Sequence, residues 1–122
     1  MSREELLDLQ LERMNWCVQY AYDNVPFYQK SVKDAGVEPG VLKTLEDITK
    51  FPFILKQDMR DNYPDGLFAV PRSKVARLHA SSCTTGQATV VGSTENDLKH
   101  WGECFARGLA ICDCDENATM QI

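Results

Sequence analysis

The chain has 122 residues, of which 43% are hydrophobic and 25% charged, so wholesale disorder is excluded and one domain, or a piece of a larger one, is expected. Its net charge of −5 and the absence of a basic stripe argue against a nucleic-acid partner. No apolar run is long enough to span a bilayer, and the N-terminus lacks the layout of a signal peptide. Five irregularly spaced cysteines do not suggest a disulfide framework, so a reduced, cytoplasmic protein is expected.

Two helices are predicted in the first third of the chain. Ser2 with Glu5 forms a capping box that starts the first helix, and Pro26 ends it. Apolar residues recur along it at helical spacing: Leu7, Leu11, Met14, Val18, Ala21 and Val25. Its aromatic residues, Trp16, Tyr20 and Tyr22, are interpreted as packing residues. The second helix runs from Phe27 to Ala35, and Gly36 stops it.

Short elements and loops are predicted over 37–73. Thr44 with Asp47 caps a short helix that ends near Lys50, another short helix covers 57–62, and a turn covers 63–66.

The pattern changes at residue 74. It predicts a strand over 75–80, a loop over 81–87, a strand over 88–92, a helix capped by Thr94 and Asp97, and a strand over 118–122. One face of this helix is apolar: Leu98, Trp101, Phe105, Leu109 and Cys112. The expected fold class is therefore α+β to α/β, with a helical N-terminal region over 1–73 and an incomplete α/β unit over 74–122, together one compact domain. So few short strands make a poor independent sheet, and a strand at the last residues would leave an open edge, so we interpret the second half as the beginning of a larger sheet.

The loop between the two predicted strands is rich in hydroxyl groups and contains one glycine. Its sequence is Ser81-Ser82-Cys83-Thr84-Thr85-Gly86-Gln87-Ala88-Thr89. Such a loop can present N–H and hydroxyl donors to an oxyanion, although a solvated turn has the same composition. It is not a Walker loop, because no Gly-Lys-Ser/Thr ends it.

This stretch resembles the Ser-Ser-Gly-Thr-Thr-Gly-Lys-Pro-Thr signature of adenylate-forming enzymes, in particular the phenylacetate–coenzyme A ligase family. The likeness continues through segments on both sides of the loop, namely 22–28, 51–53, 61–64, 66–71, 89–94 and 96–98. Residues from about 10 to 110 resemble the start of such a ligase without obvious gaps.

The resemblance implies an ATP- and Mg²⁺-dependent ligase of aromatic acid catabolism that activates an aryl acid as an acyl-adenylate and transfers the acyl group to coenzyme A. It implies that six residues form the ATP phosphate loop: Ser81, Ser82, Thr84, Thr85, Gly86 and Thr89. Thr89 is expected to close the loop through its own hydroxyl. The chain departs from the signature at Cys83, Gln87 and Ala88, where the family has glycine, lysine and proline. These changes add bulk, remove a positive charge and loosen the loop entrance.

Family members are several times longer than 122 residues, and no catalytic residue can be assigned in this chain. Two hypotheses therefore stay open. The chain is the N-terminal portion of a ligase, inactive alone, or it is a short non-catalytic remnant that acts as an oligomerisation or partner-binding module. Either reading predicts self-association or pairing with the missing remainder of the fold.

Three other features have a structural and a functional interpretation. A zinc site is one reading of His100, Cys104, Cys112 and Cys114, but their spacing is not that of a zinc knuckle, so no metal site is assigned. Cys83 is interpreted as an inert loop cysteine rather than a reactive thiol. His79 is interpreted as a packed residue that orients the loop by hydrogen bonds rather than as a catalytic base.

Overall fold

The structure is a computed structural model that describes residues 1–40, 42–81, 88–115 and 117–119. Two helices form its N-terminal part, α1 over Arg3–Asn24 and α2 over Pro26–Asp34. The predicted capping box is present, because the Glu5 N–H donates to Ser2 Oγ at 3.2 Å and the Ser2 N–H donates to Glu5 Oε2 at 2.6 Å. Gly36 follows α2 with a φ of +68°, a conformation that favours glycine at the end of a helix. Both predicted helices are confirmed.

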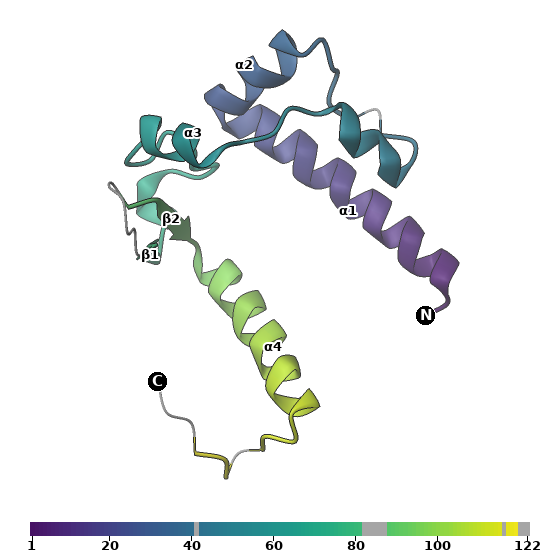
Figure 1. Ribbon diagram of the computed structural model, residues 1–122, viewed down its shortest axis with the longest axis vertical. Helices are drawn as coiled ribbons and strands as arrows, with labels where there is room; N and C mark the ends of the chain where they lie inside the picture. Colours follow the sequence, from purple (N-terminus) through teal and green to yellow (C-terminus); the bar gives the residue numbers. More distant parts are fainter. Residues whose placement is uncertain (41, 82–87, 116, 120–122) are drawn as a thin grey trace.

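The hydrophobic core lies where α1, α2 and the chain after them meet (Figure 1). It is formed by Val18, Val32, Leu42 and Phe51. Asn15 of α1 ties the later segment to this core, since its Nδ2 donates to the carbonyl oxygen of Leu42 at 3.0 Å. Among the described residues only Val25 adds another buried hydrophobic side chain. The core of this chain is therefore small and belongs to its first half.

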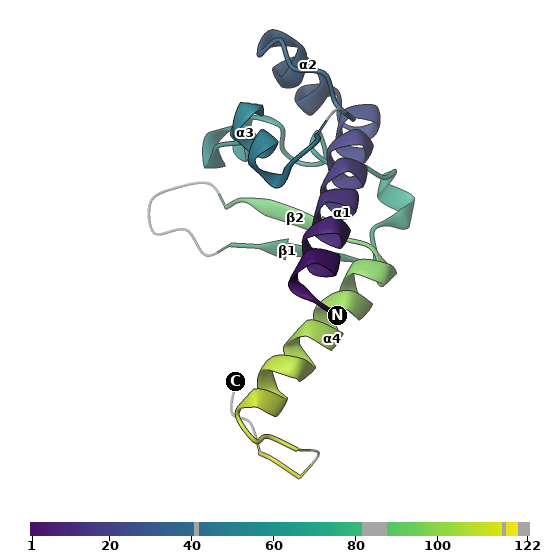
Figure 2. The same ribbon diagram turned by 90° about the vertical axis from the view of Figure 1, so that its right-hand side faces the viewer.

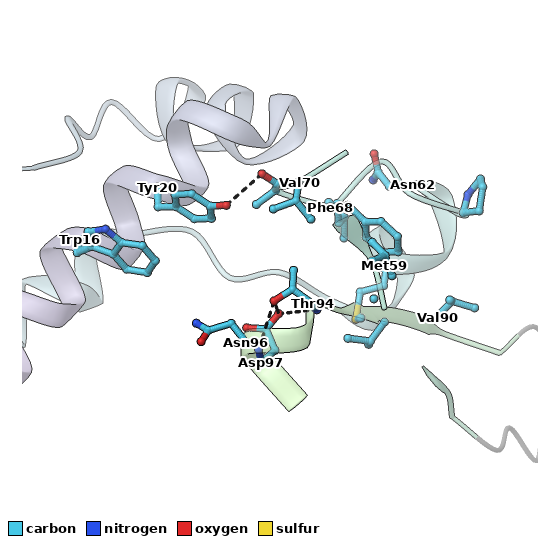
Figure 3. Close-up of a pocket in the computed structure, with 16 residues that line it drawn as sticks. Trp16, Tyr20, Met59, Asn62, Phe68, Val70, Val90, Thr94, Asn96 and Asp97 are labelled. Carbon is cyan, nitrogen blue, oxygen red and sulfur yellow. Dashed lines mark hydrogen bonds between the residues drawn. The ribbon is translucent and has the colours of Figure 1, made fainter. Parts of the chain in front are cut away.

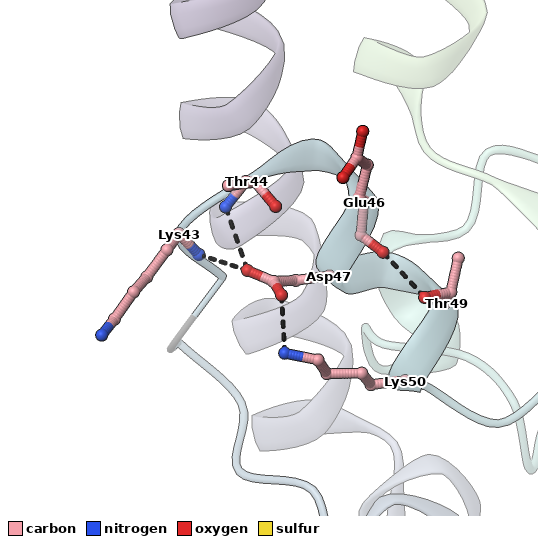
Figure 4. Close-up of polar contacts among 6 residues, drawn as sticks. All are labelled: Lys43, Thr44, Glu46, Asp47, Thr49 and Lys50. Atoms are coloured by element: carbon pink, nitrogen blue, oxygen red, sulfur yellow. Dashed lines mark hydrogen bonds and ion pairs between the residues drawn. The ribbon is translucent and has the colours of Figure 1, made fainter.

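A 3₁₀ helix, η1, covers Leu45–Lys50, where the short capped helix is predicted. Asp47 organises its start (Figure 4). One carboxylate oxygen accepts the N–H groups of Lys43 at 2.9 Å and Thr44 at 3.0 Å. The other oxygen lies 2.6 Å from Lys50 Nζ. The Lys50 contact and these two backbone donors hold the pKa of Asp47 well below its ordinary value of 3.8.

Replacing Asp47 with asparagine is expected to remove a pH-dependent part of the stability. Because the pKa of Asp47 is depressed in the folded chain, its contribution is fully present above 3.8, the ordinary value, and is lost as the pH falls toward the folded pKa. Urea unfolding should therefore separate Asp47→Asn from the unmodified chain at pH 6 and bring the two together in strong acid. A constant difference across this range would contradict the assignment.

The second half contains short elements and one long helix. Helix α3 covers Lys56–Asp61, and a second 3₁₀ turn, η2, covers Arg72–Lys74. Strands β1, Arg77–Ala80, and β2, Val90–Ser93, form an antiparallel hairpin in which His79 faces Val91. Helix α4 follows directly over Glu95–Ile111 and has the predicted cap, since the Asp97 N–H donates to Thr94 Oγ1 at 3.2 Å.

The strand predictions need correction at their ends. The first strand begins at Arg77 rather than at Val75, because the Val75 N–H donates to the Arg72 carbonyl oxygen and closes η2. The second strand begins at Val90 rather than at Ala88. The predicted strand over 118–122 does not appear at Ala118 and Thr119, and its last three residues lie outside the described part of the chain.

The surface is larger than that of a compact protein of this mass. The chain exposes 9734 Å², against about 6,600 Å² for a compact fold and about 20,000 Å² for the unfolded chain, so about half rather than about two-thirds of the surface is buried. The C-terminal turns of α4 extend away from the other elements in both views (Figures 1 and 2).

In the described part of the chain, no helix combines the length and the apolar character that a bilayer crossing requires. The division at residue 73 stays a prediction.

Candidate functional site

The hairpin brings the two ends of the hydroxyl-rich loop together. The Ser81 and Thr89 hydroxyl oxygens lie 2.6 Å apart, and the Ser81 N–H donates to the Thr89 carbonyl oxygen at 3.0 Å. Thr89 is buried, whereas Ser81 is exposed. The remaining predicted loop residues, Ser82, Thr84, Thr85 and Gly86, lie outside the described residues, as does Cys83. The structure thus joins Ser81 to Thr89, and the phosphate role of all six residues stays a prediction.

Replacing Thr89 with valine is expected to weaken the closure of the loop. Valine keeps the branched shape but removes the hydroxyl group that contacts Ser81 Oγ. Loss of one such hydrogen bond costs about 1 kcal/mol in the free energy of unfolding. Urea unfolding should show this loss. Thr49→Val is the control, because the Thr49 hydroxyl makes only an exposed hydrogen bond within η1. An equal effect of both substitutions would show that the Ser81–Thr89 contact contributes nothing specific.

His79 connects the hairpin to α4. Its ring meets the Trp101 ring edge-on, with centroids 5.2 Å apart and an interplanar angle of 88°. His79 is thus packed, as the sequence predicts. In the described part of the chain, however, it contacts the Trp101 ring of α4 and forms no hydrogen bond to the loop. His79 therefore fixes the position of β1 against α4, two residues before the loop begins.

A cavity of about 510 Å³ lies between α1, the segment from α3 to residue 70, β2 and the start of α4 (Figure 3). Most of its wall is apolar or aromatic, and the residues that define it include Trp16, Tyr20, Met59, Phe68, Val70 and Val90. Thr94, Asn96 and Asp97 add polar groups at one end. None of the described lining residues is Lys, Arg or His. The cavity therefore provides an apolar surface but no positive side chain for a carboxylate or a phosphate.

The cavity wall places two aromatic residues of α1 at its rim. Trp16 stacks on Tyr20 with centroids 5.0 Å apart, and the Tyr20 hydroxyl donates to the Ala69 carbonyl oxygen at 3.3 Å. Trp16 therefore packs on Tyr20, as predicted, but it is 66% exposed and is not a buried residue of the core. Gly92 of β2 allows a close approach on the opposite wall, since a Cβ atom there would lie 2.7 Å from the Phe68 ring.

The four residues with a possible zinc interpretation are not brought together as a group of metal ligands in the described structure. His100 and Cys104 lie on α4 and line an open groove toward Arg13 and Cys17 of α1. The described residues contain no group of three or more His, Cys, Asp or Glu side chains that could hold a metal ion. Cys104 and Cys112 are exposed, so neither is a buried residue of an apolar helix face.

Solved structures similar to this chain include those of an acyl–coenzyme A ligase. The chain matches 2-hydroxyisobutyryl-CoA ligase, solved with 2-HIB-AMP and CoA in its thioesterification state, at a TM-score of 0.79 and 32% sequence identity. The match covers 88% of this chain and 24% of that chain. An open conformation of the same ligase gives a TM-score of 0.77 at 29% identity. The fold is thus that of the N-terminal part of a CoA ligase.

The similar sequences show which kind of coenzyme A ligase this chain resembles. The chain is 56% identical over 108 residues to the phenylacetate–coenzyme A ligase of Aromatoleum evansii, and 54% identical over 110 residues to that of Thermus thermophilus. These matches cover 88% and 90% of this chain but 24% and 25% of the relatives. No family model matches the chain. The chain is therefore homologous to the N-terminal portion of phenylacetate–coenzyme A ligases and spans about a quarter of their length.

Proposed function

We propose that this chain is the N-terminal portion of an ATP-dependent aryl-acid:coenzyme A ligase, works in the cytoplasm and is inactive alone. The complete enzyme joins a small aryl acid to coenzyme A through an acyl-adenylate and releases pyrophosphate. The observation that carries this proposal is the identity of 56% to a phenylacetate–coenzyme A ligase over 88% of the chain. So high an identity over nearly the whole chain supports a shared role in the same kind of reaction.

The hairpin loop is the part of this chain that we assign to ATP. The Ser81 and Thr89 hydroxyl groups form a hydrogen bond with each other, so these residues are suited to hold the ends of the loop in place. Contacts to phosphate oxygens then fall to the hydroxyl and N–H groups of Ser82, Thr84, Thr85 and Gly86. Such positioned donors stabilise the charge that develops on phosphate oxygens during adenylation. The donor set of this loop fits an anion, and the hydroxyl pair at its base supports that assignment.

Mg²⁺ requires other ligands than the hydroxyl and N–H donors of this loop. It prefers an octahedral shell of oxygen atoms and is usually bound through one or two carboxylates together with substrate phosphates. The hydroxyl-rich loop over 81–89, which we assign to the ATP phosphates, contains no carboxylate. We therefore assign no step through Mg²⁺ to the residues of this chain.

The isolated chain is expected to be inactive because it supplies too little of an active site. Its cavity has no positive side chain among the described lining residues, and only about half of its surface is buried. Adenylation requires both reactants to be oriented in a site that excludes water. The test therefore uses a chimera in which this chain replaces the matching N-terminal quarter of the Aromatoleum evansii ligase.

The assay is phenylacetate-dependent exchange of pyrophosphate into ATP, which reports adenylation alone. We expect exchange by the chimera, and none by the isolated chain or by the ligase lacking its N-terminal quarter. A chimera that is soluble and folded but shows no exchange would overturn the proposed function.

A second candidate function is self-association of a non-catalytic remnant. The exposed aromatic residues Trp101 and Phe105 of α4 favour it, since exposed apolar patches often mark contact surfaces. It predicts that the mass of the isolated chain in sedimentation equilibrium rises with concentration. A mass that stays monomeric at high concentration would exclude this candidate.

A further inference from the structure

Helix α4 has an apolar face whose two aromatic residues are more than half exposed in the described structure. We define the α4 apolar face by Leu98, Trp101, Phe105 and Leu109, which recur at helical spacing. Trp101 and Phe105 are 55% and 56% exposed, and α4 has no buried residue. The helix follows directly after β2, and its later turns extend away from the other elements (Figure 2).

The polar side of α4 is the one that turns toward α1. His100, Glu103, Cys104 and Arg107 line the groove shared with α1. At 100° per residue these four positions lie opposite the α4 apolar face. The apolar face is therefore directed away from α1, and its Trp101 and Phe105 side chains stay more than half exposed.

The sequence of α4 indicates that the helix depends on such a partner. Gly102 and Gly108 lie within the helix, and each costs about 1 kcal/mol in helix propensity relative to alanine. A Cβ atom at either position would meet nothing within 4 Å. Most of the stability of an amphipathic helix in a protein comes from packing of its apolar face. Two glycines beside a partly exposed apolar face are suited to the close approach of another backbone.

We infer that the α4 apolar face is the docking surface for the rest of a ligase chain, namely the three quarters that follow this region in the homologous ligases. This inference rests on the proposed function. The chain covers 24% of the Aromatoleum evansii enzyme, so a much larger polypeptide lies beyond the matched region in that relative. A second copy is disfavoured as the occupant, because each copy carries a net charge of −5.

The docking surface is also next to the hydroxyl-rich loop. Trp101 of the α4 apolar face contacts His79 of β1, and Ser81 at the base of the loop follows two residues later. A polypeptide packed on α4 therefore fixes Trp101 and, through His79, the strand that leads into the loop. Docking and positioning of the loop are coupled by this one ring contact.

Hydroxyl-radical footprinting of the chimera and of the isolated chain tests the inference. Oxidation of Trp101 and Phe105 is expected in the isolated chain at every concentration and is expected to be lost in the chimera. In the chimera, Phe105→Asp should lower the melting temperature far more than Ala106→Asp, because the neighbouring position 106 lies off the apolar face. Ala106→Asp is the matched control, since it introduces the same charge at the same depth in the helix.

The outcomes separate the inference from the proposed function. Protection of Trp101 without pyrophosphate exchange keeps the docking surface and overturns the proposed function. Exchange without protection, or equal effects of Phe105→Asp and Ala106→Asp, overturns the docking surface. Protection that appears in the isolated chain as its concentration rises assigns the face to a second copy and also overturns the inference. A chimera that only aggregates, beside a soluble parental ligase, counts against docking.

Discussion

Replacing Phe51 with alanine is expected to unfold the N-terminal half of the chain. Phe51 is 9% exposed and packs in a cluster with Val18, Val32 and Leu42. Truncating a buried phenylalanine costs about 3–5 kcal/mol, through lost burial and the cavity that remains. A core of so few buried side chains cannot absorb this loss. Circular dichroism at 222 nm during urea unfolding should show a large loss of helix already without denaturant.

Phe53→Ala is the matched control for this prediction. Phe53 lies two residues further along the chain and is 91% exposed, so the same truncation removes almost no burial. Its free energy of unfolding should stay within about 0.5 kcal/mol of the unmodified chain. Equal destabilisation by the two substitutions would show that the cluster around Phe51 is not the core that stabilises α1 and α2.

If Thr85 donates to the ATP phosphates as we propose, replacing it with alanine in the chimera should slow adenylation by about a hundredfold or more, because that donor is lost. The assay is pyrophosphate exchange at saturating phenylacetate. Thr49→Ala is the control, since Thr49 lies in η1 and outside the loop. Exchange that is unaffected by Thr85→Ala would remove Thr85 from the ATP site.

A substitution at Gln87 is expected to improve the reaction of the chimera with ATP rather than to impair it. The chain has Gln87 where the resembling signature has lysine. Gln87→Lys would restore a positive charge close to the phosphates, and charged hydrogen bonds are stronger than neutral ones. We expect a lower KM for ATP in the chimera. An unchanged or higher KM would show that position 87 does not face the nucleotide.

Features set by neighbouring residues were predictable from the sequence. The caps formed by Ser2 with Glu5 and by Thr94 with Asp97 join residues three positions apart, so the spacing alone indicates both helix starts. The stop of α2 at Gly36 depends on the backbone freedom of one residue. The hydroxyl contact across the loop base depends instead on the antiparallel pairing of β1 with β2, which places Ser81 beside Thr89 and which the spacing does not indicate.

Features that depend on distant residues were not predictable. The exposure of Trp16 and the cavity beside it arise from elements spread between α1 and the start of α4. No local pattern in the sequence reports such an arrangement. The first strand begins later than predicted because Val75 forms a backbone hydrogen bond in η2 instead of joining β1. The apolar face of α4 was predictable from its spacing, but the exposure of Trp101 and Phe105 on that face was not.

The measurement that tests the central claim most directly is the formation of phenylacetyl-coenzyme A by the chimera from phenylacetate, ATP and coenzyme A. If the chain is the N-terminal portion of an aryl-acid:coenzyme A ligase, the chimera will form the thioester with a kcat/KM within about tenfold of the parental enzyme, a difference of about 1.4 kcal/mol in transition-state stabilisation. A folded chimera that forms no thioester, beside an active parental ligase, would contradict the account.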